Sequence, residues 1–380
     1  MTLLAVMACS STVSVGRLAG PEPTGEEVMP HDPALAMHRG NAQRTAEYPC
    51  HLPTPPEQRW QLQLSGSSLS PSASGRYLGY GSRDGYQLLD PASGTVLHHW
   101  ETPRRSALSE MAFDGERVFV GLGYDFVAFG LEPDEELWRW TEVRSNIARP
   151  LIYRDAVYVN GQESPPEDDG VMMKFDMKGK LQWDVRFPHE ESRWTIDIGG
   201  MAALDERLFV SVRDSLYALD LDSGTVLWST ALTANYLSMP IVASEHGIVF
   251  TRGQFVYALQ AETGVVLWSV RVEGLPVPYM AYSDGLLFMG TEEGLMRALD
   301  AQTGAEVWRH QGREFPQSPI VAGDLVLYAE LYTKLIHARD KYSGEWRWTV
   351  SLGEHGAREL ACYGDMLFAG GHTLQGLQSL

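Results

Sequence analysis

The sequence predicts an all-β fold, an eight-bladed β-propeller whose blades each have four antiparallel strands. Three observations predict it: a tryptophan-ending unit that recurs about every 40 residues, four short strand-like runs within each unit, and two chain ends that each supply part of one blade. A repeat of this length is one supersecondary unit used many times, and four strands per unit are typical of propeller blades.

The repeating unit is clearest in the second half of the chain. Four tryptophans recur at a spacing of 40 residues, each after a turn-like segment that ends in Ser/Thr-Gly: Trp228, Trp268, Trp308 and Trp348. Weaker copies end at Trp183, at Trp138, where the glycine is lost, and at His98, which stands where a tryptophan is expected. An isolated Trp60 lies 38 residues before His98 and brings the number of positions to eight.

Residues 237–270 indicate what one unit folds into. Four runs rich in β-branched and aromatic residues are separated by Gly, Asp, Ser and Glu, at residues 238–243, 247–251, 255–259 and 265–270. The Asp-x-x-Ser/Thr-Gly segment predicts a turn, because the acid or threonine caps it by hydrogen bonding and glycine supplies a positive φ. A linear solenoid is the structural alternative, but solenoid repeats of one to three strands are usually shorter.

The two ends of the chain are complementary. The last unit stops after three strands, the third at residues 373–378, whereas a spare strand around Trp60 precedes the first unit. We expect residues 58–64 to pair with residues 373–378 and complete the eighth blade from both termini. This pairing would remove an open sheet edge, which would otherwise invite aggregation.

The repeats carry a family resemblance. The element from Ala218 to Trp228, and again from Ala298 to Trp308, resembles the tryptophan-docking repeat of quinoprotein-like (PQQ-repeat) eight-bladed propellers. Residues 38–45, His-Arg-Gly-Asn-Ala-Gln-Arg-Thr, resemble the Arg-Gly-Asn strap that precedes the first blade in many members. The resemblance covers residues 38–380 and implies that tryptophan rings dock on the turn of a neighbouring blade. The docking positions are Trp60, Trp138, Trp183, Trp228, Trp268, Trp308 and Trp348.

The sequence divides into three expected segments. Residues 1–9 resemble part of a lipoprotein signal, residues 10–57 form a proline-rich tether and the strap, and residues 58–380 form the propeller. Ala8 directly precedes Cys9, as in a bacterial lipobox, so Cys9 is the expected lipidation site. The apolar run is short for a signal and no Lys or Arg precedes it, so we expect a true start further upstream; a chance cysteine is the alternative. A lipid at Cys9 would anchor the protein to a membrane without spanning it.

Net charge limits the kinds of binding partner that we expect, and the cysteines bear on the cell compartment. The net charge of −19 argues against nucleic acid or an anionic membrane surface, because phosphate binding depends on clustered Lys and Arg. Cys50 precedes the Trp60 strand, and Cys362 lies in the blade that this strand should complete. A Cys50–Cys362 disulfide is therefore a candidate in an oxidising periplasm, with a buried thiol at 362 and a free one at 50 as the alternative.

The sequence favours a protein that is not an enzyme. Quinone-dependent alcohol and sugar dehydrogenases share the resemblance, but they are far longer, many have adjacent cysteines, and their calcium ligands cannot be matched here. No hydrolase, metalloprotease or phosphate-loop motif occurs, and packing is the simplest role for the His98-His99 pair. We therefore expect no catalytic residues, no cofactor and no metal.

Departures from the regular spacing indicate where partners bind. The steps from Trp138 to Trp183 and from Trp183 to Trp228 are both 45 residues, and the extra residues fall in segments 162–170 and 187–195 of blade three. In an antiparallel blade both segments emerge on one face, and loops on rigid scaffolds commonly carry binding. The candidate partner-binding residues are Glu167, Asp168, Asp169, His189, Glu190, Arg193 and Trp194. A tolerated surface insertion is the alternative.

The resemblance extends to a non-enzymatic branch of the family, the envelope lipoproteins that assist outer-membrane β-barrel assembly. It implies protein partners, namely the barrel-assembly machinery and unfolded barrel proteins, and a lipid-anchored location on the outer membrane facing the periplasm. A different envelope-anchored protein- or ligand-binding propeller is the first alternative. A quinone-dependent dehydrogenase is the second.

Overall fold

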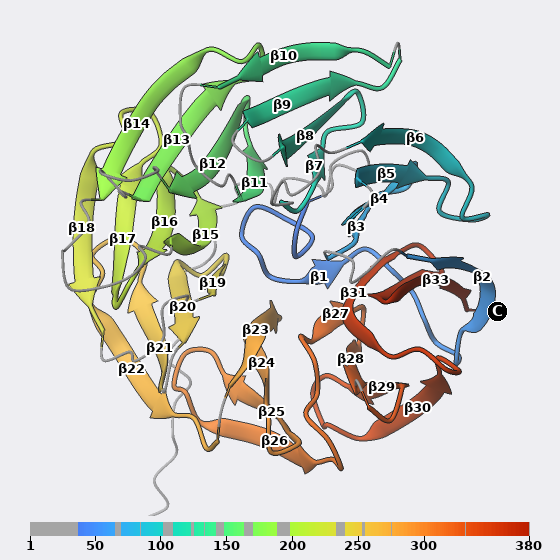
Figure 1. The fold of residues 1–380 in the computed structure, drawn as a ribbon. Helices are drawn as coiled ribbons and strands as arrows, with labels where there is room; N and C mark the ends of the chain where they lie inside the picture. The colour runs from blue at the N-terminus through green and yellow to red at the C-terminus, as the bar shows by residue number, and fades with distance from the viewer. Residues whose placement is uncertain are drawn as a thin grey trace, which may run out of the picture. The chain divides into compact units, whose positions relative to one another are not determined.

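The computed structural model describes residues 37–64, 70–83, 85–101, 109–122, 125–132, 134–141, 148–162, 170–187, 198–232, 240–252, 255–274, 276–330 and 332–379. All of these residues lie in one compact unit of the chain, Pro33–Leu380. The described strands of that unit form eight sheets arranged radially around a common axis (Figure 1).

The blades follow one another in chain order, and each begins with its innermost strand. The first four blades comprise β3 (Ser72–Ala73), β4 (Leu78–Ser82), β5 (Gly85–Leu89) and β6 (Val96–Glu101); β7 (Ala112–Phe113), β8 (Arg117–Leu122), β9 (Asp125–Gly130) and β10 (Glu136–Trp140); β11 (Ala148–Tyr153), β12 (Ala156–Gln162), β13 (Gly170–Asp176) and β14 (Leu181–Phe187); and β15 (Ile198–Leu204), β16 (Arg207–Val212), β17 (Ser215–Asp220) and β18 (Val226–Ala231).

The next three blades repeat this order, and blade eight takes its outer strand from the N-terminal part of the unit. These blades comprise β19 (Ile241–Ala243), β20 (Ile248–Arg252), β21 (Phe255–Gln260) and β22 (Val266–Arg271); β23 (Pro276–Ser283), β24 (Leu286–Thr291), β25 (Leu295–Asp300) and β26 (Glu306–Gln311); β27 (Ile320–Ala322), β28 (Leu325–Glu330), β29 (Leu335–Asp340) and β30 (Trp346–Ser351); and β31 (Ala357–Tyr363), β32 (Met366–Gly371), β33 (Thr373–Gln378) and β2 (Glu57–Gln63).

One blade departs from the predicted composition. The sequence predicted four antiparallel strands in every blade, and this is wrong for blade seven, whose sheet has five strands. The fifth is β1 (Glu47–Tyr48), which pairs in parallel with β27, with Glu47 opposite Val321. The reason is that the axial edge of β27 has no partner within its own blade, and the strap runs along it.

Blade eight is closed by strands from both ends of the unit. β2 pairs with β33 in antiparallel fashion, with Trp60 opposite Gly376 and Gln63 opposite Thr373. The outer edge of β33 is therefore covered by a strand that lies more than 300 residues away in sequence. This pairing joins the first and last described parts of the ring.

Tryptophan docking joins neighbouring blades. The indole N–H donates to the backbone carbonyl of the second residue of the next blade's turn at 2.8–3.3 Å: Trp60 to Pro91, Trp138 to Met177, Trp183 to Leu221, Trp228 to Ala261, Trp268 to Ala301 and Trp308 to Lys341. The turn glycine lets the ring approach, because a Cβ on Gly264, where φ is +71°, would stand 2.5 Å from Trp228.

The joint between blades one and two uses different residues. The turn of blade two lacks the glycine, and its Asp134 carboxylate contacts two side chains of β6 instead. Trp100 donates its indole N–H to Oδ1 at 3.1 Å, and His98 Nδ1 lies 3.1 Å from Oδ2. The His98 ring also stacks on Trp100, with centroids 5.6 Å apart. His98 thus has a polar contact in addition to its packing role.

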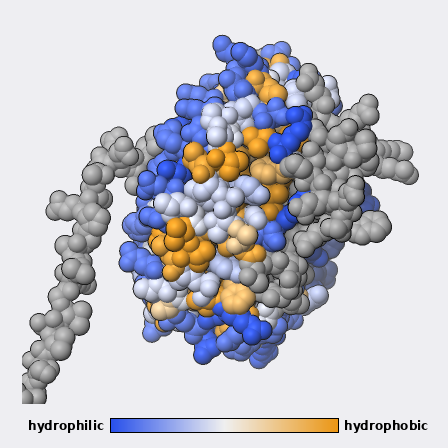
Figure 2. Space-filling view, turned by 90° about the vertical axis from the view of Figure 1, so that its left-hand side faces the viewer, coloured by the Kyte–Doolittle hydropathy of each residue, from blue (hydrophilic) through white to orange (hydrophobic). Residues whose placement is uncertain are grey.

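The apolar core lies in the three inner strands of each blade, whereas the outer strands face solvent. β24 is buried at every position, but Val226 and Leu227 on β18 and Val266 and Leu267 on β22 are exposed. Figure 2 shows such apolar residues interspersed with hydrophilic ones on this side of the molecule. None of the described segments is a helix long and apolar enough to cross a membrane.

Candidate protein-binding face and axial cluster

The two insertions of blade three are attached at the same end of its sheet. Gln162, the last residue of β12, is opposite Gly170, the first residue of β13, and Gly170 is opposite Phe187, the last residue of β14. Segments 163–169 and 188–197 therefore connect to three neighbouring strand ends. The candidates Glu167, Asp168, Asp169, His189, Glu190, Arg193 and Trp194 lie in these segments, outside the described residues.

The first insertion makes its connection longer than the corresponding connection of another blade, whereas the second does not. Between β12 and β13 the chain uses residues 163–169, whereas the corresponding connection in blade four is only residues 213–214. The connection from β14 to β15, residues 188–197, is no longer than that from β6 to β7, residues 102–111. The long loop between the second and third strands is thus the special feature of blade three.

A disulfide fastens the strap to blade eight. Cys50 and Cys362 are bonded, with Cα atoms 5.9 Å apart and a sequence separation of 312. Backbone hydrogen bonds flank the bond: His51 N–H donates to the Gly364 carbonyl at 2.7 Å, and Gly364 N–H donates to the Pro49 carbonyl at 3.0 Å. Cys9, the expected lipidation site, lies outside the described residues.

The strap, defined here as residues 37–56, follows the axis past successive inner strands. Its backbone carbonyls accept hydrogen bonds at 2.8–2.9 Å from blades four to seven: Ala42 from Ala203, Gln43 from Ala243, Thr45 from Tyr282 and Ala46 from Val321. The strap therefore satisfies backbone donors that the inner strands cannot pair within their own blades.

Two strap arginines add side-chain contacts to blades four, six and seven and reach blade three as well. The Arg44 guanidinium donates to the carbonyls of Met201 at 3.3 Å and Pro150 at 3.2 Å, and also to that of His38. Arg39 donates to the carbonyls of Met280 at 2.7 Å and Pro319 at 2.5 Å. Each arginine thus joins two blades through the strap.

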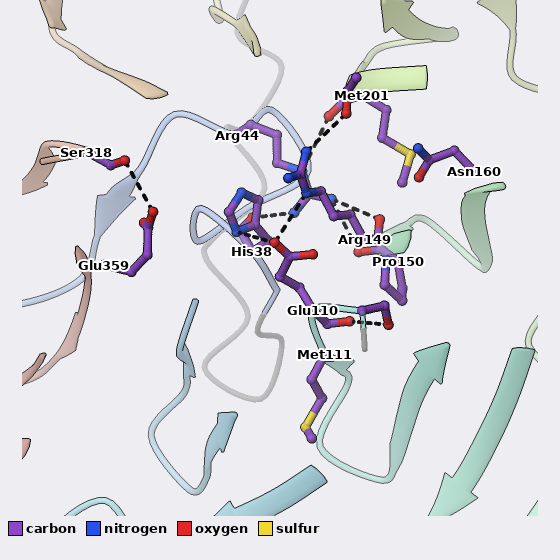
Figure 3. Close-up of polar contacts among 12 residues, drawn as sticks. His38, Arg44, Glu110, Met111, Arg149, Pro150, Asn160, Met201, Ser318 and Glu359 are labelled. Carbon is purple, nitrogen blue, oxygen red and sulfur yellow. Dashed lines mark hydrogen bonds and ion pairs between the residues drawn. The ribbon is translucent and has the colours of Figure 1, made fainter. Parts of the chain in front are cut away.

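Acidic groups from two blades accompany these cations. Arg149 Nε donates to the Glu110 carboxylate at 3.2 Å, and the two residues belong to different blades (Figure 3). Across the axis, the Ser318 hydroxyl donates to Glu359 at 3.3 Å. We call Arg39, Arg44, Glu110, Arg149 and Glu359 the axial cluster.

Burial dominates the electrostatics of this region. It lowers the pKa of His38 well below the usual value, with Arg44, Arg149 and Arg39 adding to the effect, so His38 is neutral near pH 7. Burial also raises the pKa of Glu359 to about 7, although the nearby Arg39 charge opposes the shift. Glu110 is the main cause of a raised pKa at Arg149.

Sequence reasoning did not single out the axial cluster. Arg39 and Arg44 belong to the segment that resembled a strap, but their side chains received no role. A signal was present at Glu110, Arg149 and Glu359, because each is a charged residue at or beside an inner strand that is mostly apolar. Among the residues that the structure describes, no three His, Cys, Asp or Glu side chains are grouped so that they could hold a metal ion.

A ring of four-stranded blades, joined by indoles that dock on Asp-x-x-Ser/Thr-Gly turns, defines the class of PQQ-repeat β-propellers. Within this class, a family model described as outer membrane protein assembly factor BamB matches residues 82–193, 188–278 and 274–377. These matches span more than half of the chain, which therefore belongs to the BamB family. No protein of curated function matches the sequence.

Solved structures share the fold at low sequence identity. BamB from Moraxella catarrhalis is 12% identical with a TM-score of 0.65, covering 85% of this chain and 100% of that one. Quinohemoprotein alcohol dehydrogenase from Comamonas testosteroni is 11% identical with a TM-score of 0.71, covering 90% of this chain and 80% of that one. The computationally designed Ika8 protein is 15% identical with a TM-score of 0.68, covering 84% of this chain and 100% of that one.

Proposed function

We propose that the protein is a non-enzymatic scaffold of the bacterial envelope that binds protein partners during the assembly of outer-membrane β-barrel proteins. The partners are a subunit of the assembly machinery and unfolded barrel proteins. Membership of the BamB family supports the role. In this proposal Cys9 carries the lipid, and the propeller faces the periplasm from the outer membrane.

The observation that carries the proposal is the register of blade three. Because Gln162, Gly170 and Phe187 are neighbours, two segments rich in charged residues are attached side by side to a rigid sheet. Arginine and tryptophan are favoured at binding hot spots, and Arg193 and Trp194 lie in the second segment. These two residues are the proposed contact to the assembly subunit.

Affinity purification from detergent-solubilised membranes tests this role. The tagged protein should capture barrel-assembly subunits, and the Arg193→Ala/Trp194→Ala variant should capture far less. The matched control is Trp346→Ala/Arg347→Ala, which removes the same residue types from the exposed outer strand β30. Equal capture by the two variants would exclude the proposed contact, and loss of every assembly subunit from the wild-type sample would favour a different envelope partner.

A dehydrogenase is the competing class, since quinohemoprotein alcohol dehydrogenases share the fold. At 11% identity this likeness concerns the fold alone. The measurement is dye-linked alcohol oxidation after addition of the quinone with calcium. We expect no dye reduction above that of the buffer, and turnover would contradict the proposed role.

A further inference from the structure

A pocket opens beside the strap near the propeller axis. It encloses about 390 Å³ including its open mouth, and its lining includes the polar side chains of His38, Arg39, Arg44, Arg149, Asn160 and Tyr279. Flat groups form part of its wall: the guanidinium carbons of Arg39 and Arg149 lie 5.4 and 5.7 Å from the centroid of the Tyr279 ring. Two cations thus face one aromatic ring.

Several polar atoms of this lining lack a hydrogen-bond partner among the described residues. They are Nε and Nη1 of Arg39, both ring nitrogens of His38 and Oδ1 of Asn160. Arg39 and His38 are each only 3% exposed, so bulk water does not bathe these groups. Leaving a buried charged donor without an acceptor costs considerable free energy, so an acceptor beside Arg39 would be strongly stabilising.

The protein's own acids do not supply that acceptor. The Glu110 carboxylate is engaged by Arg149 at 3.2 Å, and Glu359 accepts from Ser318 at 3.3 Å. The three arginines therefore leave an excess of positive charge in the pocket, although the whole chain carries −19. This local reversal of charge is a feature of anion-binding sites.

We propose that the axial pocket binds a small carboxylate, which accepts hydrogen bonds from the unpaired N–H groups of Arg39 beside the flat side chains of Arg149 and Tyr279. A planar anion suits these flat side chains better than a tetrahedral one, and a free Asn160 carbonyl oxygen can accept from a hydroxyl or amino group on the same ligand.

Titration calorimetry of the full chain with sodium acetate tests the site, with sodium chloride keeping the ionic strength constant. We expect saturable binding of acetate by the wild type and weaker binding of sulfate. Arg39→Lys keeps the charge but removes the guanidinium donors, so acetate affinity should fall about tenfold, the effect of one charge-assisted hydrogen bond. Asn160→Asp adds a negative charge to the pocket and should weaken binding at least as much.

Arg154→Lys is the matched control, because Arg154 is exposed and pairs with Glu206. Its acetate affinity should equal that of the wild type, and circular dichroism checks the folding of each variant. The site is excluded if the wild type shows no saturable binding of acetate. It is also excluded if a folded Arg39→Lys or Asn160→Asp variant binds acetate as tightly as the wild type does, because the acetate is then an adventitious ion only. Sulfate binding as tight as that of acetate would overturn the carboxylate assignment.

Discussion

The indole N–H of Trp348 donates a hydrogen bond of 3.1 Å to the backbone carbonyl of Leu52. Trp348 is the docking tryptophan of blade seven, and six equivalent indoles bond to the turn of the next blade instead. Blade eight takes its outer strand from the N-terminal side, so the strap lies where that turn would be. The last docking contact therefore fastens the strap rather than a blade.

Truncation of Trp348 tests how much this contact contributes to stability. Trp348 is 3% exposed, whereas Trp346, two residues earlier on the same strand, is 61% exposed. We expect Trp348→Ala to lower the free energy of unfolding by about 3–5 kcal/mol, because it removes a buried ring and a hydrogen bond. Trp346→Ala should change it by less than about 1 kcal/mol. Urea unfolding measures both, and similar losses would contradict the docking role.

The turn glycines provide a second test. Gly264 and Gly247 have nearly equal φ angles of +71° and +69°, but an added Cβ meets Trp228 at 2.5 Å only in the first case and nothing within 4 Å in the second. In both alanine variants the left-handed backbone conformation lowers the free energy of unfolding by about 1 kcal/mol. Gly264→Ala must also displace the ring, so its loss of stability should exceed that of Gly247→Ala by at least about 1 kcal/mol. Equal melting temperatures would show that the close approach is unimportant.

Removal of the disulfide should destabilise the closure of the ring. The Cys50→Ala/Cys362→Ala variant loses a bond that closes a loop of more than 300 residues, and we expect a loss of about 2–4 kcal/mol. Reductant should lower the melting temperature of the wild type and leave that of the variant unchanged. A wild-type melting curve that does not respond to complete reduction would contradict a stabilising role.

The pH dependence of stability should change in Glu359→Gln. Burial raises the pKa of Glu359 to about 7 in the folded protein, from 4.5 in the unfolded chain. Between these values the folded state holds a proton that the unfolded state has released, so this group lowers stability as pH rises from 4.5 to 7.

The Glu359→Gln variant has no carboxyl group at this position, so it does not lose stability in this way between pH 4.5 and 7. Its stability relative to the wild type should therefore rise across the same interval, by no more than about 3 kcal/mol, since Glu359 keeps some access to solvent. Denaturant titrations at pH 4.5, 6 and 7.5 measure the difference. A difference that stays constant with pH would contradict the raised pKa.

Regular spacing made much of the scaffold predictable. The turn glycine and the tryptophan four residues later recur in sequence, so docking of Trp228, Trp268 and Trp308 could be predicted from local pattern. The parallel pairing of Glu47 with Val321 could not, because a two-residue strand leaves no periodic signal. Trp100 was missed as the partner of Asp134 because it lies two residues beyond the repeating position.

The site was harder to predict than the scaffold. Glu110, Arg149 and Glu359 come from three different blades, and only the closed ring brings them to the strap arginines. Sequence spacing cannot report such a convergence, since each residue is a single departure within an otherwise regular repeat. The insertions of blade three were visible because they change the repeat length, but Arg193 and Trp194 lie outside the described residues and remain predictions.

The most direct test of the central claim is association of the purified chain with the purified barrel-inserting subunit of the assembly machinery, measured by sedimentation in detergent. The account predicts a discrete complex of the two proteins, which Trp346→Ala/Arg347→Ala preserves and Arg193→Ala/Trp194→Ala weakens. Two separately sedimenting species at all concentrations would contradict a scaffold role in barrel assembly.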